Sequence, residues 1–543
     1  DERGRFTAAY NHRWRQDAEP GEVDGRWQTD AHKANQRDLG GLRTRIEQSN
    51  TLAAKLFAMG ATPLLTERRG FDGLADPAGS WLGLSGSRAY MPATLDKTLA
   101  ELALLDVESA LWSTHAARWS ELTRRWCDPE PGWLQSIAYI DGTADPYWTR
   151  AYARSGKVSR VGRVMPCLSR VALHGGAGVP LLIQTFAGAA PLRRSLSPML
   201  AQLREAVGEQ ASVDRLTVVD SEAGYVGVLW ALHAADDVFF VSVVKGQVLA
   251  GADLRQEGSW QSFRERDELC EGGVRLFGKD GPKAGLPLRA VLMRRGNSSH
   301  PHPHPTVFVT NASSEDLSTE QVASVYLARW PRQEQSFRDG RDGGGLNRSF
   351  GFGRELVADV ALTGKLEQVH ARLRRAKQAH EKAEQTREQL DYALAAAPAQ
   401  IRAKGLKLAD KDIGLTQRAI SKHAKDLAAL ESMPATIQQR DTGRDSIMTC
   451  LKTGMLALVE FVQQEYFGGR SANWRSFIEQ LVALPVTVRT SPTRRLFLIH
   501  ENRRQPALME QLEAALEEIN RRELVRDDRK WEFQLARWPI GGP

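Results

Sequence analysis

The chain has 543 residues, about three to four domains' worth, so it can bury more than one core and is not one small module. Hydrophobic residues make up 42% and charged residues 26%, which excludes collagen-like, globally disordered and mini-protein classes. The 73 Lys and Arg exceed the 66 Asp and Glu by only seven, so the net charge of +7 permits nucleic-acid binding without demonstrating it.

Cysteine usage and hydropathy indicate the compartment. The four cysteines lie far apart and form no C-x-x-C pair, which argues against a zinc site and fits a reducing cytoplasm. No uncharged apolar run approaches the roughly 18 residues that span a bilayer. We therefore expect a cytoplasmic protein with no membrane partner.

Residues 1–132 are predicted to be mainly helical. Apolar positions recur at helical spacing, among basic residues, between Asp30 and Met59, and a second such pattern runs from Leu95 toward Trp126. Two interpretations stay open for this domain: a helical bundle with a solvated basic face, and a domain that binds DNA ends.

After this region the pattern changes to short β-type runs. Strands are predicted at Ile137–Ile140, Met165–His174, Val179–Phe186, Arg215–Val219 and Val238–Val244. Helices are predicted at Pro191–Val207 and Tyr225–His233. The predicted order is therefore βββαβαβ.

A β-rich segment follows at about 246–311, where short β-like runs are broken by Gly, Pro and charge. A helix is then predicted from Ser318 through Arg338, with Ser318 among the residues that can cap its start.

The region 356–435 is predicted to be a helical hairpin that resembles a coiled coil. From Leu366 to Leu394 apolar residues recur at steps of three and four, or their multiples, and a second helical stretch follows Pro398. Protein–protein association and intrachain packing both stay open as its role. In 436–543 we predict an α/β region for dimerisation or DNA contact, with a helix, a β-hairpin and a charged helix.

Two aspartates stand out because each comes directly after an apolar strand. Asp141 follows Ile137–Ile140, and Asp220 follows the strand that ends at Val219. Carboxylates that converge from adjacent strands make an oxygen-rich site suited to Mg²⁺ or Mn²⁺. The alternative is ordinary turn chemistry, above all for the pair Asp141-Gly142.

A third acid lies on the helix after the β-rich segment. Glu334 is surrounded there by basic and aromatic residues over about three turns. Glu334 and Arg338 are four residues apart, so a surface ion pair is the simple interpretation. The same composition is what a catalytic helix in contact with DNA requires.

These features together resemble the DDE transposases of the IS4-like superfamily, which are encoded by bacterial insertion sequences. Tyr-Ile-Asp-Gly-Thr looks like the first-aspartate motif, Val-Val-Asp-Ser-Glu like the second, and Arg-Trp-x-x-Gln-Glu-x-x-Phe-Arg like the glutamate helix. The resemblance covers about 133–355. It implies an α/β fold in which an RNase H-like catalytic core with a β-rich insertion is flanked by mainly helical N- and C-terminal regions.

The superfamily's Tyr-(2)-Arg-(3)-Glu-(6)-Lys signature is met imperfectly. Tyr326 and Arg329 have the expected spacing, but four residues separate Arg329 from Glu334, and Arg341 stands in place of Lys. On an ideal helix the extra residue rotates Glu334 by about 100° relative to Arg329. A local bulge or a distortion at Pro331 would absorb this rotation.

The resemblance implies a two-metal mechanism of DNA cleavage and strand transfer. Asp141, Asp220 and Glu334 would be the catalytic residues and would hold two Mg²⁺ or Mn²⁺ ions. The expected partners are double-stranded transposon ends, target DNA and a second copy of the chain in the DNA complex, with the protein at the nucleoid in the cytoplasm. The residues expected to bind DNA are Tyr326, Arg329, Trp330, Arg338 and Arg341.

Three alternatives stay open. The chain could be a related nuclease that cleaves without joining, because hydrolysis and strand transfer use the same site. It could also be a catalytically inactive, domesticated DNA-binding protein. Within the site, Glu222 competes with Glu334 as third ligand, because it lies two residues beyond Asp220 and would share its face in an extended strand.

Overall fold

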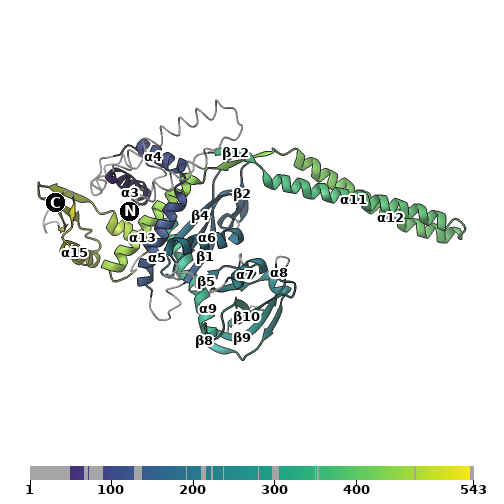
Figure 1. Cartoon of the computed structure of the whole chain (residues 1–543), viewed down its shortest axis with the longest axis horizontal. Helices are drawn as coiled ribbons and strands as arrows, with labels where there is room; N and C mark the ends of the chain where they lie inside the picture. Colours follow the sequence, from purple (N-terminus) through teal and green to yellow (C-terminus); the bar gives the residue numbers. More distant parts are fainter. Residues whose placement is uncertain are drawn as a thin grey trace. The chain divides into compact units, whose positions relative to one another are not determined.

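The computed structural model describes residues 49–66, 71, 90–127, 137–190, 192–208, 216–221, 224–235, 238–278, 281–295, 305–348, 350, 354–469, 473–526 and 528–537. Part of the helix predicted from Asp30, and Glu222, lie outside these residues. The chain divides into two compact units. The smaller unit consists of Tyr147–Ser155 and Gly353–Arg440, and the larger unit holds the rest (Figure 1).

The larger unit is built on a mixed sheet, which has 11 strands in the described part of the chain and confirms the predicted α/β architecture. Its order is β2-β3-β1-β5-β6-β11-β10-β9-β7, with β4 on β3 and β8 on β9. The first strands are β1 (Ile137–Pro146), β2 (Ser155–Val158), β3 (Arg163–His174), β4 (Pro180–Ala187), β5 (Leu216–Val219) and β6 (Phe239–Val244). The β-rich segment adds β7 (Asp253–Gln256), β8 (Gln261–Arg264), β9 (Asp267–Leu276), β10 (Leu286–Arg295) and β11 (Thr306–Thr310).

Strand direction divides this sheet into three parts. The strands β1, β5 and β6 are parallel neighbours. On one side β3 pairs antiparallel with both β1 and β4. On the other side β11 pairs antiparallel with β6, and β10 and β9 follow. The β-rich segment therefore extends the central sheet, and the short strand β2 is an element that sequence patterning did not predict.

Helices cover both faces of the sheet because the side chains of a strand alternate between faces. Ala138 and Ile140 pack in a core with α5 (Glu108–Arg125), α6 (Leu192–Val207) and α7 (Val226–His233). Ile137 and Tyr139 point to the other face, against α9 (Thr319–Leu327). A short helix, α8 (Gly246–Ala250), leads from β6 into β7.

The long helix α13 (Gly443–Tyr466) joins three cores of the larger unit. Ile447 and Met448 pack with the N-terminal helices α3 (Ser49–Thr66) and α4 (Pro92–Leu104). Cys450 and Ala457 pack against the sheet core, and Leu456 packs with the C-terminal elements. The four cysteines, including Cys450, are buried and form no disulfide.

The C-terminal part of the larger unit forms a separate four-stranded sheet in the described residues. It contains the predicted hairpin of β14 (Val486–Thr490) and β15 (Arg494–His500), and adds β16 (Val525–Arg526) and β17 (Arg529–Ala536). Strand β15 pairs in parallel with β17, and α15 (Pro506–Arg521) connects them. The short α14 (Trp474–Phe477) precedes a π-helical segment at Ile478–Val482.

The smaller unit contains the predicted helical hairpin, formed by α11 (Val360–Ala393) and α12 (Ala399–Glu431). At its base β12 (Arg354–Ala358) pairs antiparallel with β13 (Thr436–Arg440). Asp359 caps α11 by accepting from the backbone N–H groups of Ala361 and Leu362, and Tyr152 donates to the same carboxylate at 2.7 Å. Among the helices that the structure describes, none is long and apolar enough to cross a membrane.

Candidate active site

The register of the central strands places Asp141 next to Asp220. In the parallel pair of β1 and β5, Ile137 lies opposite Leu216 and Ile140 opposite Val219, so each aspartate is the next residue after the last registered pair. Asp141 does not follow its strand as predicted, because β1 continues to Pro146 through antiparallel pairing with β3. Both carboxylates belong to the sheet face that α9 covers, because Tyr139 and Val218, two residues earlier, pack against α9.

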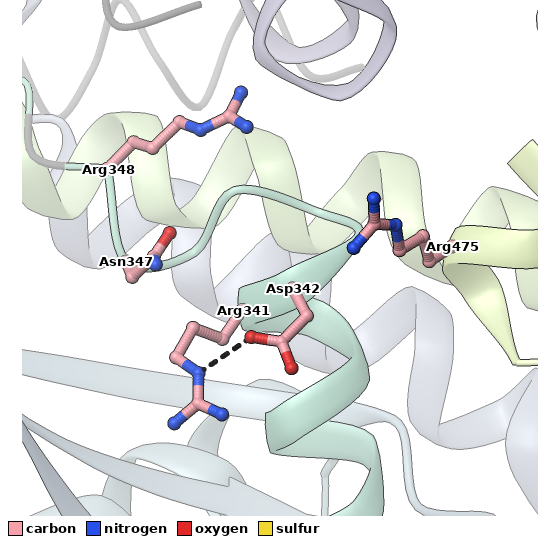
Figure 2. A pocket seen from close by; sticks show the side chains of 5 residues that line it. All are labelled: Arg341, Asp342, Asn347, Arg348 and Arg475. Atoms are coloured by element: carbon pink, nitrogen blue, oxygen red, sulfur yellow. Dashed lines mark hydrogen bonds and ion pairs between the residues drawn. The ribbon is translucent and has the colours of Figure 1, made fainter. Parts of the chain in front are cut away.

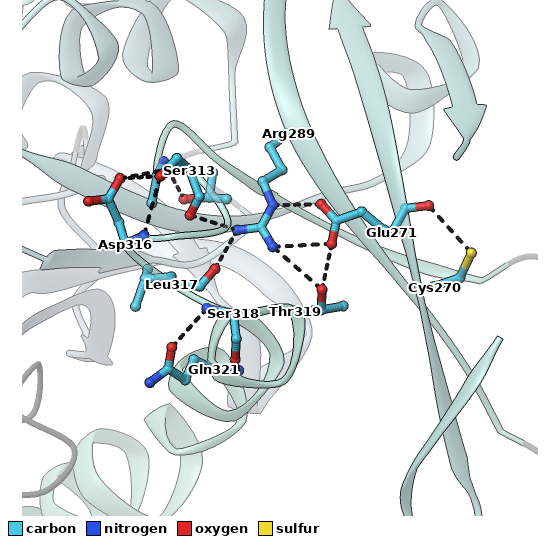
Figure 3. A network of polar contacts seen from close by, with 11 residues as sticks. Cys270, Glu271, Arg289, Ser313, Asp316, Leu317, Ser318, Thr319 and Gln321 are labelled. Carbon is cyan, nitrogen blue, oxygen red and sulfur yellow. Dashed lines mark hydrogen bonds and ion pairs between the residues drawn. The ribbon is translucent and has the colours of Figure 1, made fainter. Parts of the chain in front are cut away.

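The helix that carries the third acid begins at a well-defined position. Ser318 caps α9, and Gln321 bonds back to the Ser318 backbone N–H in a capping box. Figure 3 shows how the start of this helix is fixed to the sheet: Arg289 of β10 pairs with Glu271 of β9 at 2.6 Å and donates to the Leu317 carbonyl. Helix α9 is therefore anchored to the antiparallel strands at the end opposite the site.

The extra residue between Arg329 and Glu334 is accommodated by a π-helical segment, Trp330–Glu334. The backbone N–H of Gln335 bonds to the Trp330 carbonyl, a five-residue step in place of the four-residue step of an α-helix. The wider turn returns Glu334 to the face of Arg329, so the predicted bulge is confirmed. An α-helix then continues as α10 (Gln335–Asp342).

A glycine-rich turn between β3 and β4 packs against this π-helical segment. Arg332 of the π-helical segment donates to the Gly176 carbonyl in the turn between β3 and β4. Gly178 of the same turn has φ +83°, and a Cβ there would lie 2.4 Å from the Arg332 carbonyl oxygen. Only glycine permits both the left-handed backbone and the close approach.

Three carboxylates converge on the guanidinium of Arg329. Its Nη1 lies 3.0 Å from Asp141 Oδ2, and its Nη2 lies 3.3 Å from Asp220 Oδ1 and 2.7 Å from Glu334 Oε1. Tyr326, one turn earlier, donates its hydroxyl to Asp220 at 3.0 Å. The structure thus brings together Asp141, Asp220 and Glu334 from two strands and a helix.

The charges of this cluster do not balance. Three carboxylates and one guanidinium leave an excess of two negative charges if all are ionised. Burial raises the pKa of Asp141 to about 6, with Arg329 lowering it and Asp220 and Glu334 raising it further. Burial, with the Asp220 charge, also raises the pKa of Tyr326, which keeps its hydroxyl a donor.

The donor set fits a divalent cation of the Mg²⁺ type. All three acids offer carboxylate oxygens, the ligands that Mg²⁺ and Mn²⁺ prefer, and divalent cations would supply the positive charge that the acids lose when Arg329 is displaced. In the described part of the chain no three acidic, His or Cys side chains are already grouped as ligands. At this cluster the guanidinium of Arg329 occupies the space between the acids, so cation binding requires Arg329 to move.

The cluster opens into a cavity of about 520 Å³, large enough for a phosphodiester group and several waters. Its lining includes Asp141, Asp220, Glu334 and the buried Gln333. Three of the residues predicted to bind DNA also line it, namely Trp330, Arg338 and Arg341.

The remaining predicted residues differ in exposure. Trp330 is 60% exposed, so it is not a core aromatic. Tyr326 is partly buried, with its ring 5.4 Å from that of Phe308. Arg338 bonds to Gln335, and Glu334 pairs with Arg329, so the simple Glu334–Arg338 surface pair is not what forms.

Sequence reasoning missed two cationic residues that line the cavity. Lys157 of β2 and Arg160 just after it line the cavity beside the carboxylates, and Arg160 lies 3.7 Å from Asp145. The run Ser-Gly-Lys-Val-Ser-Arg contains the charge, but only the unpredicted pairing of β2 with β3 brings it to the site.

Comparison with known proteins adds no family assignment. No protein-family model matches the chain, and no curated protein sequence matches it.

Proposed function

We propose that this chain is a DDE-type DNA transposase that cleaves DNA at insertion-sequence ends and joins them to a target. One observation carries the proposal: Asp141, Asp220 and Glu334 gather around a single guanidinium at the mouth of a cavity. They are separated by 220 − 141 = 79 and 334 − 220 = 114 residues. Such a concentration of partly buried negative charge is costly for stability, so a role in binding cations is the better explanation.

The arrangement of the central strands supports an RNase H-like core. Leaving aside the short β2, the elements from β1 to β6 follow the predicted βββαβαβ order. The antiparallel strands β4 and β3 lie on one side of β1, and the parallel strands β5 and β6 lie on the other. The two aspartates then come from adjacent central strands, where backbone pairing holds them rigidly.

The chemistry follows from the positions of these side chains. Asp141, Asp220 and Glu334 would hold divalent cations, and Arg329 would leave the carboxylates to neutralise a phosphate. When bound, two such cations activate an attacking oxygen and stabilise the leaving oxygen of an in-line phosphoryl displacement. Tyr326 keeps the Asp220 carboxylate oriented through its hydrogen bond.

The rim of the cavity is suited to a DNA backbone. Arg338 and Arg341 of α10, and Lys157 and Arg160 from β2 and the turn after it, line the same cavity as the three acids. Cationic side chains of this kind neutralise phosphates and set the position of the strand. The exposed indole of Trp330 offers a surface on which an unpaired base can stack.

The same proposal includes the partners. Joining two ends requires that both be held together, so we propose that two copies of the chain pair on DNA and that the helical hairpin of α11 and α12 contributes to this pairing. With transposon ends and target DNA as its partners, the protein would act at the nucleoid.

The test uses duplexes that carry the DNA flanking the gene, where short inverted repeats bounded by a small direct duplication are expected. Asp141→Asn and Asp220→Asn should bind these duplexes and lose strand cleavage in Mg²⁺. Asp253→Asn, which changes a half-exposed carboxylate on β7, is the matched control and should cleave normally. Undiminished cleavage by either active-site variant would refute the proposal.

A second measurement separates the transposase from a nuclease. Products in which the cleaved end is joined to a plasmid target are expected from a transposase. Cleavage without joined products would favour the related nuclease. Binding without cleavage by the wild-type chain in Mg²⁺ or Mn²⁺ would favour an inactive DNA-binding protein.

A further inference from the structure

A second pocket lies beyond the last turn of α10, and we call it the arginine pocket. It is lined by Arg341, Asp342, Asn347, Arg348 and Arg475, and has a volume of about 250 Å³ (Figure 2). Its residues come from the end of α10, the loop that follows and the first turn of α14. Sequence reasoning singled out only Arg341.

The backbone is shaped to bring these segments together. Gly343, directly after α10, packs against α14 so closely that a Cβ would lie 2.8 Å from the backbone nitrogen and Cα of Arg475. The loop after it is held by the buried Lys452 of α13, which donates to the carbonyls of Gly345 and Arg348 at 3.0 and 2.8 Å. The position of the pocket is therefore set by the fold.

The three guanidinium groups are oriented by contacts. Arg348 donates to the Pro63 carbonyl at 2.9 Å, Arg341 to Asp342 at 2.9 Å, and Arg475 to Glu479 at 2.7 Å. The lining carries three positive charges against the single carboxylate of Asp342. A guanidinium has five N–H donors in a planar fork that matches phosphate oxygens, so this lining suits a phosphate group.

Size narrows the class of ligand. Pockets that enclose a whole small-molecule ligand typically measure about 300–1,000 Å³. At about 250 Å³ the arginine pocket is smaller, which fits one phosphate group better than a complete nucleotide.

The arginine pocket and the carboxylate cavity have one lining residue in common, Arg341. The two sites are therefore neighbours, and one DNA strand can engage both. We propose that the arginine pocket is a phosphate-binding subsite that holds a backbone phosphodiester of the DNA strand engaged by the carboxylate cavity. The pocket's phosphate chemistry stands alone, whereas its assignment to DNA rests on the proposed function.

The test measures binding of the full chain to the gene-flanking duplex without divalent cations, over 50–200 mM salt. The affinity falls as salt rises, so a plot of log affinity against log salt has a negative slope. Arg348→Gln and Arg475→Gln should each make this slope less steep by about one. Over that fourfold range the double variant should then lose about 12-fold less affinity than the wild type. Arg521→Gln, an equal charge change on the exposed face of α15, should leave the slope unchanged.

Folding and ligand source have separate controls. Thermal unfolding checks that each variant is folded. If Arg348→Gln is not, Arg475→Gln becomes the decisive variant, because the Arg475 side chain is half-exposed. If the wild type binds and cleaves DNA while Arg475→Gln keeps the wild-type slope, the subsite is refuted and the proposed function stands. If inorganic phosphate raises the melting temperature of the wild type but not of the double variant, and no DNA binds, the assignment to DNA is refuted along with the proposed function.

Discussion

Arg329 is predicted to act as an internal cation that a divalent ion can replace. The substitution Arg329→Met keeps the length of the side chain and removes its charge. Asp141, Asp220 and Glu334 are then left unpaired, and each is only 22–28% exposed. Removing one partner of a buried ion pair costs about 3–5 kcal/mol. Because these acids keep some access to water, we expect a loss of about 3 kcal/mol, at the lower end of that range.

The assay is urea unfolding at pH 7, first with EDTA and then with Mg²⁺. Mg²⁺ at about 100 times its dissociation constant stabilises a folded protein by about 2.7 kcal/mol, so it should restore most of the loss. The wild type should respond less, because its guanidinium competes for the same oxygens. Arg338→Met is the matched control, since this exposed side chain bonds only Gln335 among the contacts found and should change stability by less than about 0.5 kcal/mol.

Two results would contradict this reasoning. Unfolding of Arg329→Met at the wild-type urea concentration in EDTA would mean that the three ion pairs contribute nothing to stability. Equal stabilisation of the wild type and the variant by Mg²⁺ would mean that Arg329 and the cation do not share a site.

Four further predictions address the site and the hairpin. Because the pKa of Asp141 is raised from near 4 to about 6, the folded chain binds more protons than the unfolded chain between these values. Its stability should therefore fall as pH rises from 4 to 6 by an amount that Asp141→Asn removes; equal slopes of unfolding free energy against pH in both proteins would contradict this. Glu334→Gln should abolish cleavage at any Mg²⁺ concentration while Glu222→Gln leaves substantial activity, and the reverse result would move the third ligand to Glu222. Deleting Pro331 should convert the π-helical segment to an α-helix and keep cleavage, whereas deleting Ala328 should abolish it, and equal losses in the two deletions would show that the bulge does not set the register. Replacing the helical hairpin by a short Gly/Ser linker should reduce paired-end DNA complexes in gel-shift assays more than single-end binding; equal losses, or none, would make the hairpin an intrachain packing element.

Local patterning was sufficient for the main elements around the site and for the candidate acids. Alternating and helical periodicities predicted the strands around Asp141 and Asp220 and the helix that leads to Glu334, because these signals depend on neighbours a few residues apart. The departure of the Arg329–Glu334 spacing from the superfamily signature led us to expect a bulge or a distortion at Pro331, and the π-helical segment Trp330–Glu334 contains that proline.

Only the tertiary structure decided what surrounds these residues. The extension of β1 beyond Asp141 depends on its pairing with β3, a contact between distant segments, and the position of Lys157 depends on β2, which has no strong local signal. The contacts of Arg329 with Asp141 and Asp220, and the meeting of Arg341 with Arg475 in one pocket, join segments more than 100 residues apart. Such contacts are set by how helices and sheets pack against one another, which sequence periodicity does not encode.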